Sequence, residues 1–204
     1  MHKYDADGLA FQRYSRVSQQ GAGDDILAGN SLSIVGLYKA IYGINPQFNR
    51  LYLDPHLPAK LSGTELIYNF RHDKLKIGLE TDHYSISNDQ YKITSKSDFG
   101  YYSDRDELYY FNGEDDSYSL KANTAESLLL EILVWDPVEY SWLQSSAGDH
   151  GKVFYTINVK SANTLYTIFD GYRNWFVKSD RKGFLKFEVK TTKTTIPLNI
   201  RLKK

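Results

Sequence analysis

The hydrophobic period of this sequence changes at one point, and that change limits the folds open to the chain. Before Gly43, apolar residues recur at helical spacing, as at Leu32, Val35 and Tyr38. Beyond Pro46, short segments in which apolar and polar residues alternate with a period of two continue to the C-terminus. A period of two places successive side chains on opposite faces of a strand. The residues therefore predict a mainly β protein with one substantial N-terminal helix.

The expected helix spans Ser31–Tyr42. Asn30 or Ser31 provides an N-cap, Gly43 is well placed as the C-cap, and Pro46 follows. Apolar residues surround much of its circumference, and a helix of that kind is normally covered on several sides. We therefore expect this helix to pack against structure beyond the predicted strands.

The strands are expected to be short and antiparallel. Four of them, with links of two or three residues, predict a meander: Thr64–Phe70, Leu75–Glu80, His83–Ser87 and Tyr91–Ser95. An Asn-Gly turn signal at residues 112–113 separates Leu108–Phe111 from Tyr118–Lys121. The last third adds Leu128–Trp135, Val153–Val159, Leu165–Phe169, Trp175–Lys178, Phe184–Val189 and Thr195–Leu202, with a long loop expected between Trp135 and Gly151. Many short strands at close intervals predict an antiparallel β-sandwich.

Aromatic residues are unusually frequent, with 17 tyrosines and 10 phenylalanines among 204 residues. Such residues favour half-buried strands, and a flat ring also packs well on the apolar face of a sugar. On the number of aromatic residues alone, we favour their use in half-buried strands over their use in binding sugar. The absence of cysteine excludes disulfides and thiolate chemistry.

The charge balance argues against nucleic acid as a partner. There are 25 basic and 25 acidic residues, whereas proteins that bind phosphate backbones normally carry a basic excess. No apolar run approaches the roughly 18 residues needed to cross a bilayer. The first residues contain no apolar segment typical of a signal peptide. We expect a soluble protein without a cofactor, in a compartment that the sequence leaves open.

One stretch, residues 29–86, carries an ordered set of features that resembles a known family. An apolar helix leads into Tyr42-Gly43-Ile44-Asn45-Pro46, then Leu51-Tyr52-Leu53-Asp54-Pro55-His56-Leu57-Pro58, Gly63-Thr64 and further strands. This order is similar to the junction in cellobiose-phosphorylase-like and maltose-phosphorylase-like six-hairpin enzymes. In those enzymes the last helix of an (α/α)6 barrel runs into a C-terminal β-sandwich.

The resemblance implies a carbohydrate context and three consecutive parts. Residues 1–50 correspond to a loop plus helix from the end of a barrel, 51–100 to a first β-sandwich part and 101–204 to a second one. It also implies a partner, namely an (α/α)6 barrel domain or subunit. The catalytic acid of such enzymes lies in barrel loops that this sequence lacks, so no catalytic residue is carried over. A second resemblance, in 163–171 and 179–187, is to sandwich modules of secreted polysaccharide-degrading enzymes.

Acidic and histidine residues provide few candidates for chemistry. Asp24 and Asp25 precede the predicted helix and are weak catalytic candidates, since paired carboxylates cleave glycosidic bonds. Adjacent carboxylates do not face one another, and the alternative is that the pair favours the dipole of the following helix. His56 lies between two prolines, but no second ligand occurs at metal-binding spacing. We therefore predict no metal site.

Tryptophan and tyrosine rings are the candidates for binding carbohydrate. Trp142 is the strongest, because it lies in a polar segment where burial is not otherwise explained, and Trp135, Tyr140 and Trp175 accompany it. The alternative is that these rings close the ends of the sandwich core.

Two functions follow from these observations. The first is a non-catalytic C-terminal β-sandwich portion of a glycoside hydrolase or phosphorylase, which supports an (α/α)6 barrel. The alternative is a carbohydrate-binding module that holds an oligosaccharide or polysaccharide on exposed aromatic residues. A free-standing enzyme is not favoured, because no acid/base constellation emerges from the sequence.

Overall fold

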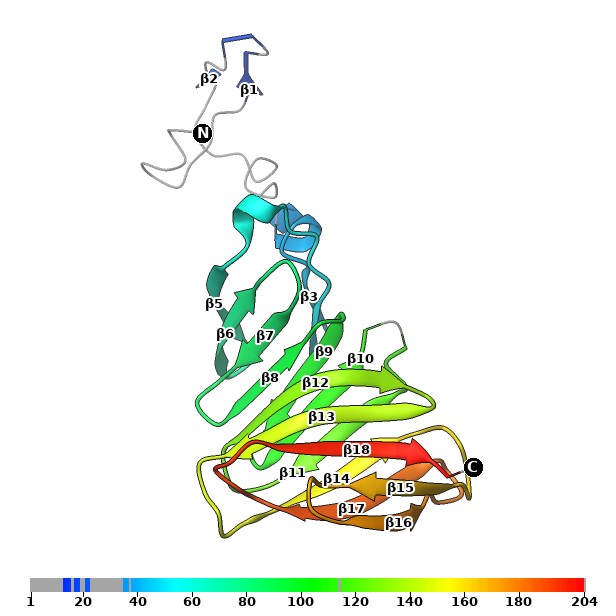
Figure 1. The fold of residues 1–204 in the computed structure, drawn as a ribbon. Helices are drawn as coiled ribbons and strands as arrows, with labels where there is room; N and C mark the ends of the chain where they lie inside the picture. The colour runs from blue at the N-terminus through cyan, green and yellow to red at the C-terminus, as the bar shows by residue number, and fades with distance from the viewer. Residues whose placement is uncertain are drawn as a thin grey trace.

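The computed structural model describes residues 13–15, 17–18, 21–22, 35–36, 38–113 and 115–203. In this part of the chain, β-strands dominate and form two large sheets that pack face to face (Figure 1). A separate two-stranded pair joins β1 (Arg13–Tyr14) to β2 (Gly21–Ala22). The prediction of a mainly β sandwich is confirmed.

The first large sheet has seven strands, and all its neighbours pair antiparallel. In spatial order they are β17 (Phe184–Lys190), β14 (Lys152–Asn158), β11 (Ser119–Asn123), β10 (Glu107–Asn112), β9 (Phe99–Asp104), β4 (Arg50–Leu53) and β3 (Ile44–Gln47). A short 3-10 helix, η1 (Ala59–Leu61), follows β4 in the chain.

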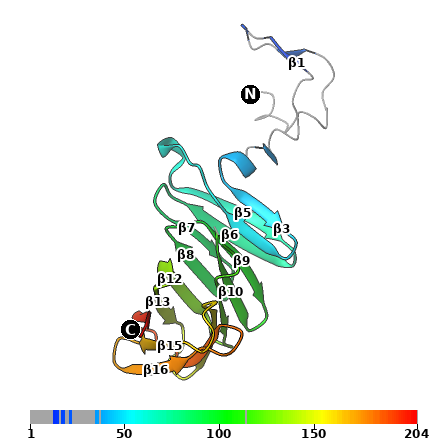
Figure 2. The same cartoon turned by 90° about the vertical axis from the view of Figure 1, so that its right-hand side faces the viewer.

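The second large sheet has nine strands and is mixed. In spatial order they are β16 (Asn174–Lys178), β15 (Leu165–Phe169), β18 (Ile196–Leu202), β13 (Glu139–Ser146), β12 (Leu128–Asp136), β8 (Tyr91–Ser95), β7 (Tyr84–Ser87), β6 (Asp73–Leu79) and β5 (Thr64–Phe70). Strands β5–β8 form the predicted meander, whereas β8 and β12 pair parallel. Figure 2 shows β8, β12 and β13 on one side of the molecule and β9 and β10 on the other.

Both sheets continue across the boundary that we expected near residue 100. In the nine-stranded sheet β8 pairs with β12, and in the seven-stranded sheet β4 pairs with β9. The chain reaches this arrangement by crossing repeatedly between sheets after β8. The segments 51–100 and 101–204 therefore share hydrogen-bonded sheets, although each contributes one end of an elongated sandwich.

A row of aromatic rings runs through the core between the sheets. Neighbouring centroids along the row lie 5.0–6.3 Å apart, and the rings belong in order to Phe99, Tyr110, Trp135, Trp142, Tyr155, Phe187 and Trp175. Edge-to-face and offset arrangements at this spacing add to the free energy of apolar burial. The high aromatic content thus has a structural use, because wide rings fill the space between two long sheets.

A β-bulge in β12 turns one of these rings inward. Ile132 pairs with Trp142 and Val134 with Ser141, so Leu133 is the extra residue on the bulged strand. Leu133 and Val134 both lie on the exposed side, and the alternation then resumes with Trp135 against the core. Without the bulge, a strict period of two would place Trp135 on the outer face.

The substantial N-terminal helix is not found in the described residues. Of the expected span 31–42, residues 35–36 and 38–40 are helical, Tyr42 already lies in a bend, and 31–34 and 37 are outside the described residues. The described helix is therefore short. None of the helices that the structure describes is long and apolar enough to span a membrane.

Candidate functional site at the junction

Gly43 forms the point at which the short helix turns into the sandwich. Its φ of +61° is the left-handed conformation that glycine adopts without a steric penalty at helix ends. A Cβ at this position would lie 2.0 Å from the backbone carbonyl atoms of Asp54. The position therefore accepts only glycine without a shift of the backbone, as the predicted C-cap requires.

Backbone hydrogen bonds attach the helix end to the segment that follows β4. The amide of Asp54 donates to the carbonyl of Gly43 at 3.0 Å, and the amide of His56 donates to that of Ile41 at 2.9 Å. These bonds extend the β3–β4 hairpin to the last turn of the helix. The proline-rich segment thus holds the helix end against the sandwich, although only some of its amides can donate.

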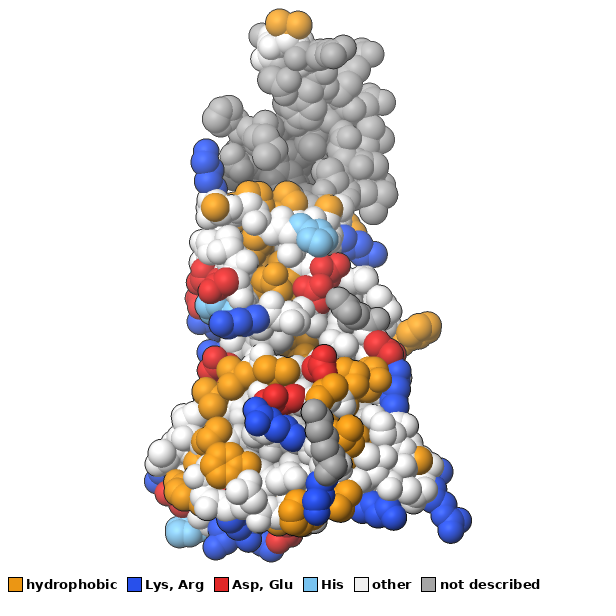
Figure 3. All heavy atoms as spheres, turned by 45° about the vertical axis from the view of Figure 1, so that its right-hand side comes forward, with side chains coloured by type: hydrophobic (Ala, Val, Ile, Leu, Met, Phe, Trp, Pro, Cys, Tyr) orange, Lys and Arg blue, Asp and Glu red, His pale blue; other side chains and the backbone are white. Residues whose placement is uncertain are grey.

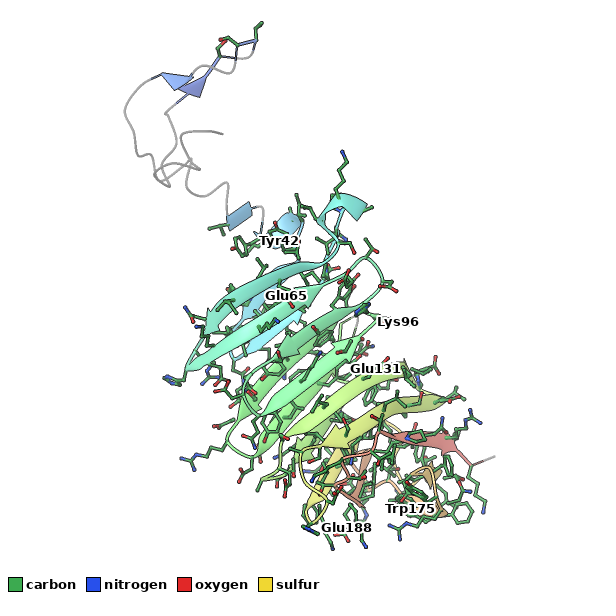
Figure 4. The ribbon with its side chains drawn as sticks, turned by 60° about the vertical axis from the view of Figure 1, so that its left-hand side comes forward. Tyr42, Glu65, Lys96, Glu131, Trp175 and Glu188 are labelled. Atoms are coloured by element: carbon green, nitrogen blue, oxygen red, sulfur yellow. The ribbon has the colours of Figure 1, made fainter. Side chains whose placement is uncertain are left out.

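Two tyrosine rings, Tyr38 in the helix and Tyr42 in the bend after it, pack at the β3–β5 end of the sandwich. Tyr38 and Tyr42 pack edge to face, with centroids 5.5 Å apart and an interplanar angle of 71°. Both are half-buried and contact the core beside Leu57, Leu66 and Tyr68, which are only partly buried themselves. Figure 4 shows Tyr42 at this end of the molecule and Trp175 at the opposite end.

The rest of the described helix does not cover this end further. Val35, on the same predicted stripe as Tyr38, is half exposed, and Lys39 and Ala40 are exposed. Only one side of the short helix therefore contacts the sandwich in the part of the chain that the structure describes.

A polar cleft of about 580 Å³ lies beside the junction. It is lined by Lys39, Gly43, Asn45, Gln47, Tyr52, Leu53, Asp54, Asp98, Gly113, Asp115 and Asp116. At its rim the guanidinium of Arg50 binds the carboxylate of Asp116 and lies 3.9 Å from the ring centroid of Phe111. The hydroxyl of Tyr52 donates to the same carboxylate at 3.1 Å.

A second ion pair fixes the neighbouring loop between β10 and β11. Lys160 binds the carboxylate of Asp115 and lies 4.1 Å from the ring centroid of Tyr118, while the Ser117 hydroxyl donates to the Asp115 carboxylate at 2.5 Å. The bond to Lys160 is the largest cause that lowers the pKa of Asp115 to about 2. A carboxyl group with so low a pKa is ionised at neutral pH and is a poor general acid.

In the described part of the cleft, the carboxylates of Asp115 and Asp116 are each paired with a basic side chain, Lys160 and Arg50 respectively. No group of three or more possible metal ligands occurs among the residues that the structure describes. His56 is exposed, and its Nε2 lies 3.7 Å from Oδ1 of Asp54.

The rings predicted to bind carbohydrate face the core. Trp142 and Tyr140 each have an exposed fraction of 0%, and Trp135 and Trp175 pack against the core as partly buried residues. Trp142 lies on strand β13 and not in the expected long loop. Because side chains alternate between the two faces of a strand, its ring points into the core between the sheets. A ring without exposure cannot pack on a sugar from solvent, and this applies to both Trp142 and Tyr140.

The structure leaves the predicted acidic pair untested, and it contains ion pairs that the sequence did not predict. Asp24 and Asp25 lie outside the described residues, so the structure places neither. The ion pairs at the junction cleft were missed, because Arg50 and Asp116 are distant in sequence and their pairing depends on the β4–β9–β10 register. The signal that could have indicated them was the charged turn Glu114-Asp115-Asp116 opposite a basic residue that begins a strand.

Comparisons of the chain with models of protein families, with curated proteins and with solved structures found no match.

Proposed function

We propose that this chain is the non-catalytic C-terminal β-sandwich portion of a carbohydrate-active enzyme, a glycoside hydrolase or phosphorylase, and supports an (α/α)6 barrel. The barrel is supplied by another domain of the same protein or by another subunit. The sandwich holds the end of the last barrel helix in a fixed direction. Catalytic groups come from the barrel in this proposal.

The single observation that carries the proposal is the geometry at Gly43. The residue has the left-handed φ and the close backbone contact that a helix-to-sandwich junction needs. The pattern around it, Gly-Ile-x-Pro followed by Leu-x-Leu-x-Pro-x-Leu-Pro, is the one that resembles the six-hairpin enzymes. Within this pattern, the backbone amides of Asp54 and His56 donate hydrogen bonds that hold the end of the helix against the sandwich.

The surface at this end of the sandwich supports a partner there. The side chain of Val35 is half exposed, and Leu66 and Tyr68 in β5 are only partly buried. An apolar side chain on a helix gains free energy when another element covers it. Further helices packed on this end would bury these groups.

The proposal is tested by expressing the chain alone and expressing it with the coding sequence that adjoins it. We expect the longer protein to contain the barrel and to hydrolyse or phosphorolyse glycosides. The 204-residue chain should show no turnover on aryl glycosides, and none on oligosaccharides with phosphate. Gly43→Val in the longer protein should reduce its activity through loss of the junction, whereas Val138→Ala, at an exposed position in the turn between β12 and β13, should not.

Two results would reject the proposal. One is glycoside turnover by the 204-residue chain alone. The other is an adjoining sequence that encodes no helical barrel, together with a stable monomer that binds no barrel subunit encoded beside it.

A further inference from the structure

The outer face of the nine-stranded sheet contains a hollow of about 640 Å³ at its C-terminal end. Its lining comes from three neighbouring strands, β15, β16 and β18, and consists of Thr167, Phe169, Asn174, Pro197, Asn199 and Arg201. A volume of this order is typical of pockets that hold small molecules. This hollow is formed by the sheet surface, at the other end of the molecule from the junction.

The register of the strands places five of the six lining residues, all except Pro197, in two rows across the sheet, and Phe176, Glu139 and Ser141 extend these rows beyond the lining. The first row, in the order β16, β15, β18 and β13, is Phe176, Thr167, Arg201 and Glu139. The second row, in the same order, is Asn174, Phe169, Asn199 and Ser141. Directly paired residues share a face of a sheet. Each row therefore combines one phenylalanine ring with polar side chains.

Three of the polar groups, Glu139, Arg201 and Asn199, are connected by hydrogen bonds, and the charges of Glu139 and Arg201 are opposite. Oε1 of Glu139 accepts hydrogen bonds from Nη2 of Arg201 at 2.9 Å and from Nδ2 of Asn199 at 2.6 Å. The bonds from Arg201 and then Asn199 lower the pKa of Glu139, so this carboxylate stays ionised beside its partner. Because the guanidinium and the carboxylate neutralise each other, the rows favour a neutral polar ligand over a strongly charged one.

An exposed ring, Phe176, is the strand partner of the lining residue Thr167. Phe176 is 57% exposed, although it lies in the regular strand β16, and Phe169 lies one row away at partial exposure. The ammonium of Lys203 lies 4.2 Å from the Phe176 ring centroid and limits the ring's freedom on that side. Figure 3 shows hydrophobic side chains in both the upper and the lower half of the described part of the molecule, with acidic and basic side chains between them.

We propose that this hollow binds a neutral oligosaccharide. Pyranose rings have apolar faces, which suit Phe176 and Phe169, and hydroxyl groups, which suit Asn199, Arg201 and Glu139 as paired donors and acceptors. The arrangement provides both kinds of contact side by side on a rigid sheet, where little order is lost on binding. The inference goes beyond the proposed function, because it needs no barrel and assigns a ligand site to the sandwich itself.

The test is a titration of the ¹⁵N-labelled 204-residue chain with cellohexaose, maltohexaose, xylohexaose and mannohexaose at millimolar concentrations. We expect at least one of them to bind, with amide shifts concentrated in β15, β16 and β18. Phe176→Ala and Asn199→Ala should each weaken that binding about tenfold or more. Ile67→Ala removes an equally exposed apolar side chain from the outer face of β5 in the same sheet, and it should leave the affinity unchanged.

The outcomes separate this inference from the junction proposal, because the isolated chain is used throughout. The inference is overturned if none of the four sugars binds, or if shifts map to β3–β5. It is also overturned if an acidic oligosaccharide such as hexagalacturonate binds more tightly than every neutral one. Thermal unfolding of Phe176→Ala should match that of the parent chain. A loss of binding in this variant would then come from the missing ring contact and not from unfolding.

Discussion

The side chains of Gln144 and Tyr155 connect the two sheets through the core. The hydroxyl of Tyr155, on β14, donates to Oε1 of Gln144, on β13, at 2.5 Å. Nε2 of Gln144 then donates to the backbone carbonyl of Lys190 at 3.3 Å. Burial raises the pKa of the Tyr155 phenol, so its hydroxyl remains protonated and remains a donor. This polar contact lies within a largely hydrophobic core and depends on both partners being present.

Removing the Tyr155 hydroxyl should destabilise the protein. In Tyr155→Phe, Oε1 of Gln144 loses its donor while it stays buried, which costs about 1–3 kcal/mol in free energy of unfolding. Replacing both residues in Gln144→Leu/Tyr155→Phe removes the unpaired group, so the double variant should lose less than the sum of the single losses. Urea unfolding of the four proteins measures this coupling. Purely additive losses would show that the hydrogen bond does not join the sheets.

Substitution at Gly43 should be more costly than at another glycine with positive φ. Gly63 has a φ of +83°, but a Cβ there would meet only Oε1 of Glu80 at 3.8 Å. Gly63→Ala should therefore cost only the backbone term of about 1–2 kcal/mol. Gly43→Ala adds a clash with the Asp54 carbonyl at 2.0 Å, and we expect a loss of about 3 kcal/mol or more.

Urea unfolding of these two glycine variants provides the comparison. Equal losses at Gly43 and Gly63 would mean that the β3–β4 hairpin shifts at little cost. The junction would then be softer than the proposed function requires.

Local features of this fold could be predicted from the sequence, and its long-range pairings could not. The strands Thr64–Phe70, Tyr91–Ser95 and Leu165–Phe169 have the predicted bounds, because each alternates cleanly between turn residues. Strand β9 was missed, since Phe99–Asp104 carries consecutive aromatic residues rather than a regular alternation. The parallel pairing of β8 with β12 has no local signal, because more than thirty residues and three strands of the other sheet separate them in the chain.

The candidate sites illustrate the same limit. Gly43 was recognisable, because a cap and a following proline form a local pattern. The position of Trp142 was not, because polar neighbours suggested a loop, whereas in β13 Ser141 lies on the outer face while Trp142 and Gln144 lie on the inner one. The rows beside Phe176 depend on the register of four strands that are not consecutive in the chain. Such a surface becomes visible only when the sheet is assembled.

The ion pair between Asp115 and Lys160 should make stability depend on pH in the acid range. Its folded-state pKa of about 2 is below the ordinary value of 3.8, so the folded protein binds the proton less readily than the unfolded chain. The stabilisation is therefore complete above about pH 4 and is lost as the pH falls through about 2. In Asp115→Asn, the free energy of unfolding should fall less steeply as the pH is lowered from about 4 to about 2. Urea unfolding at several pH values measures this slope.

Lys160→Gln is the reciprocal variant. It removes the largest cause of the lowered Asp115 pKa. The free energy of unfolding should therefore depend less on pH in the same range, although Asp115 is still present. The double variant should add little to either single change. If the slope stays unchanged in both single variants, this pair does not contribute to acid sensitivity.

Trp142 should act on stability and not on carbohydrate binding. Its ring is fully buried between Trp135 and Tyr155, with centroids at 6.3 Å and 5.1 Å. Trp142→Ala would leave a large cavity in a row of close-packed rings, at a cost of about 3–5 kcal/mol. Phe176→Ala, at an exposed position, should change the free energy of unfolding by no more than about 0.5 kcal/mol. Urea unfolding therefore separates the two rings, and titration of the conservative variant Trp142→Phe should give the affinity of the parent chain for any bound oligosaccharide. A variant Trp142→Phe that remains fully folded yet loses that affinity would place the ligand inside the sandwich and contradict both assignments.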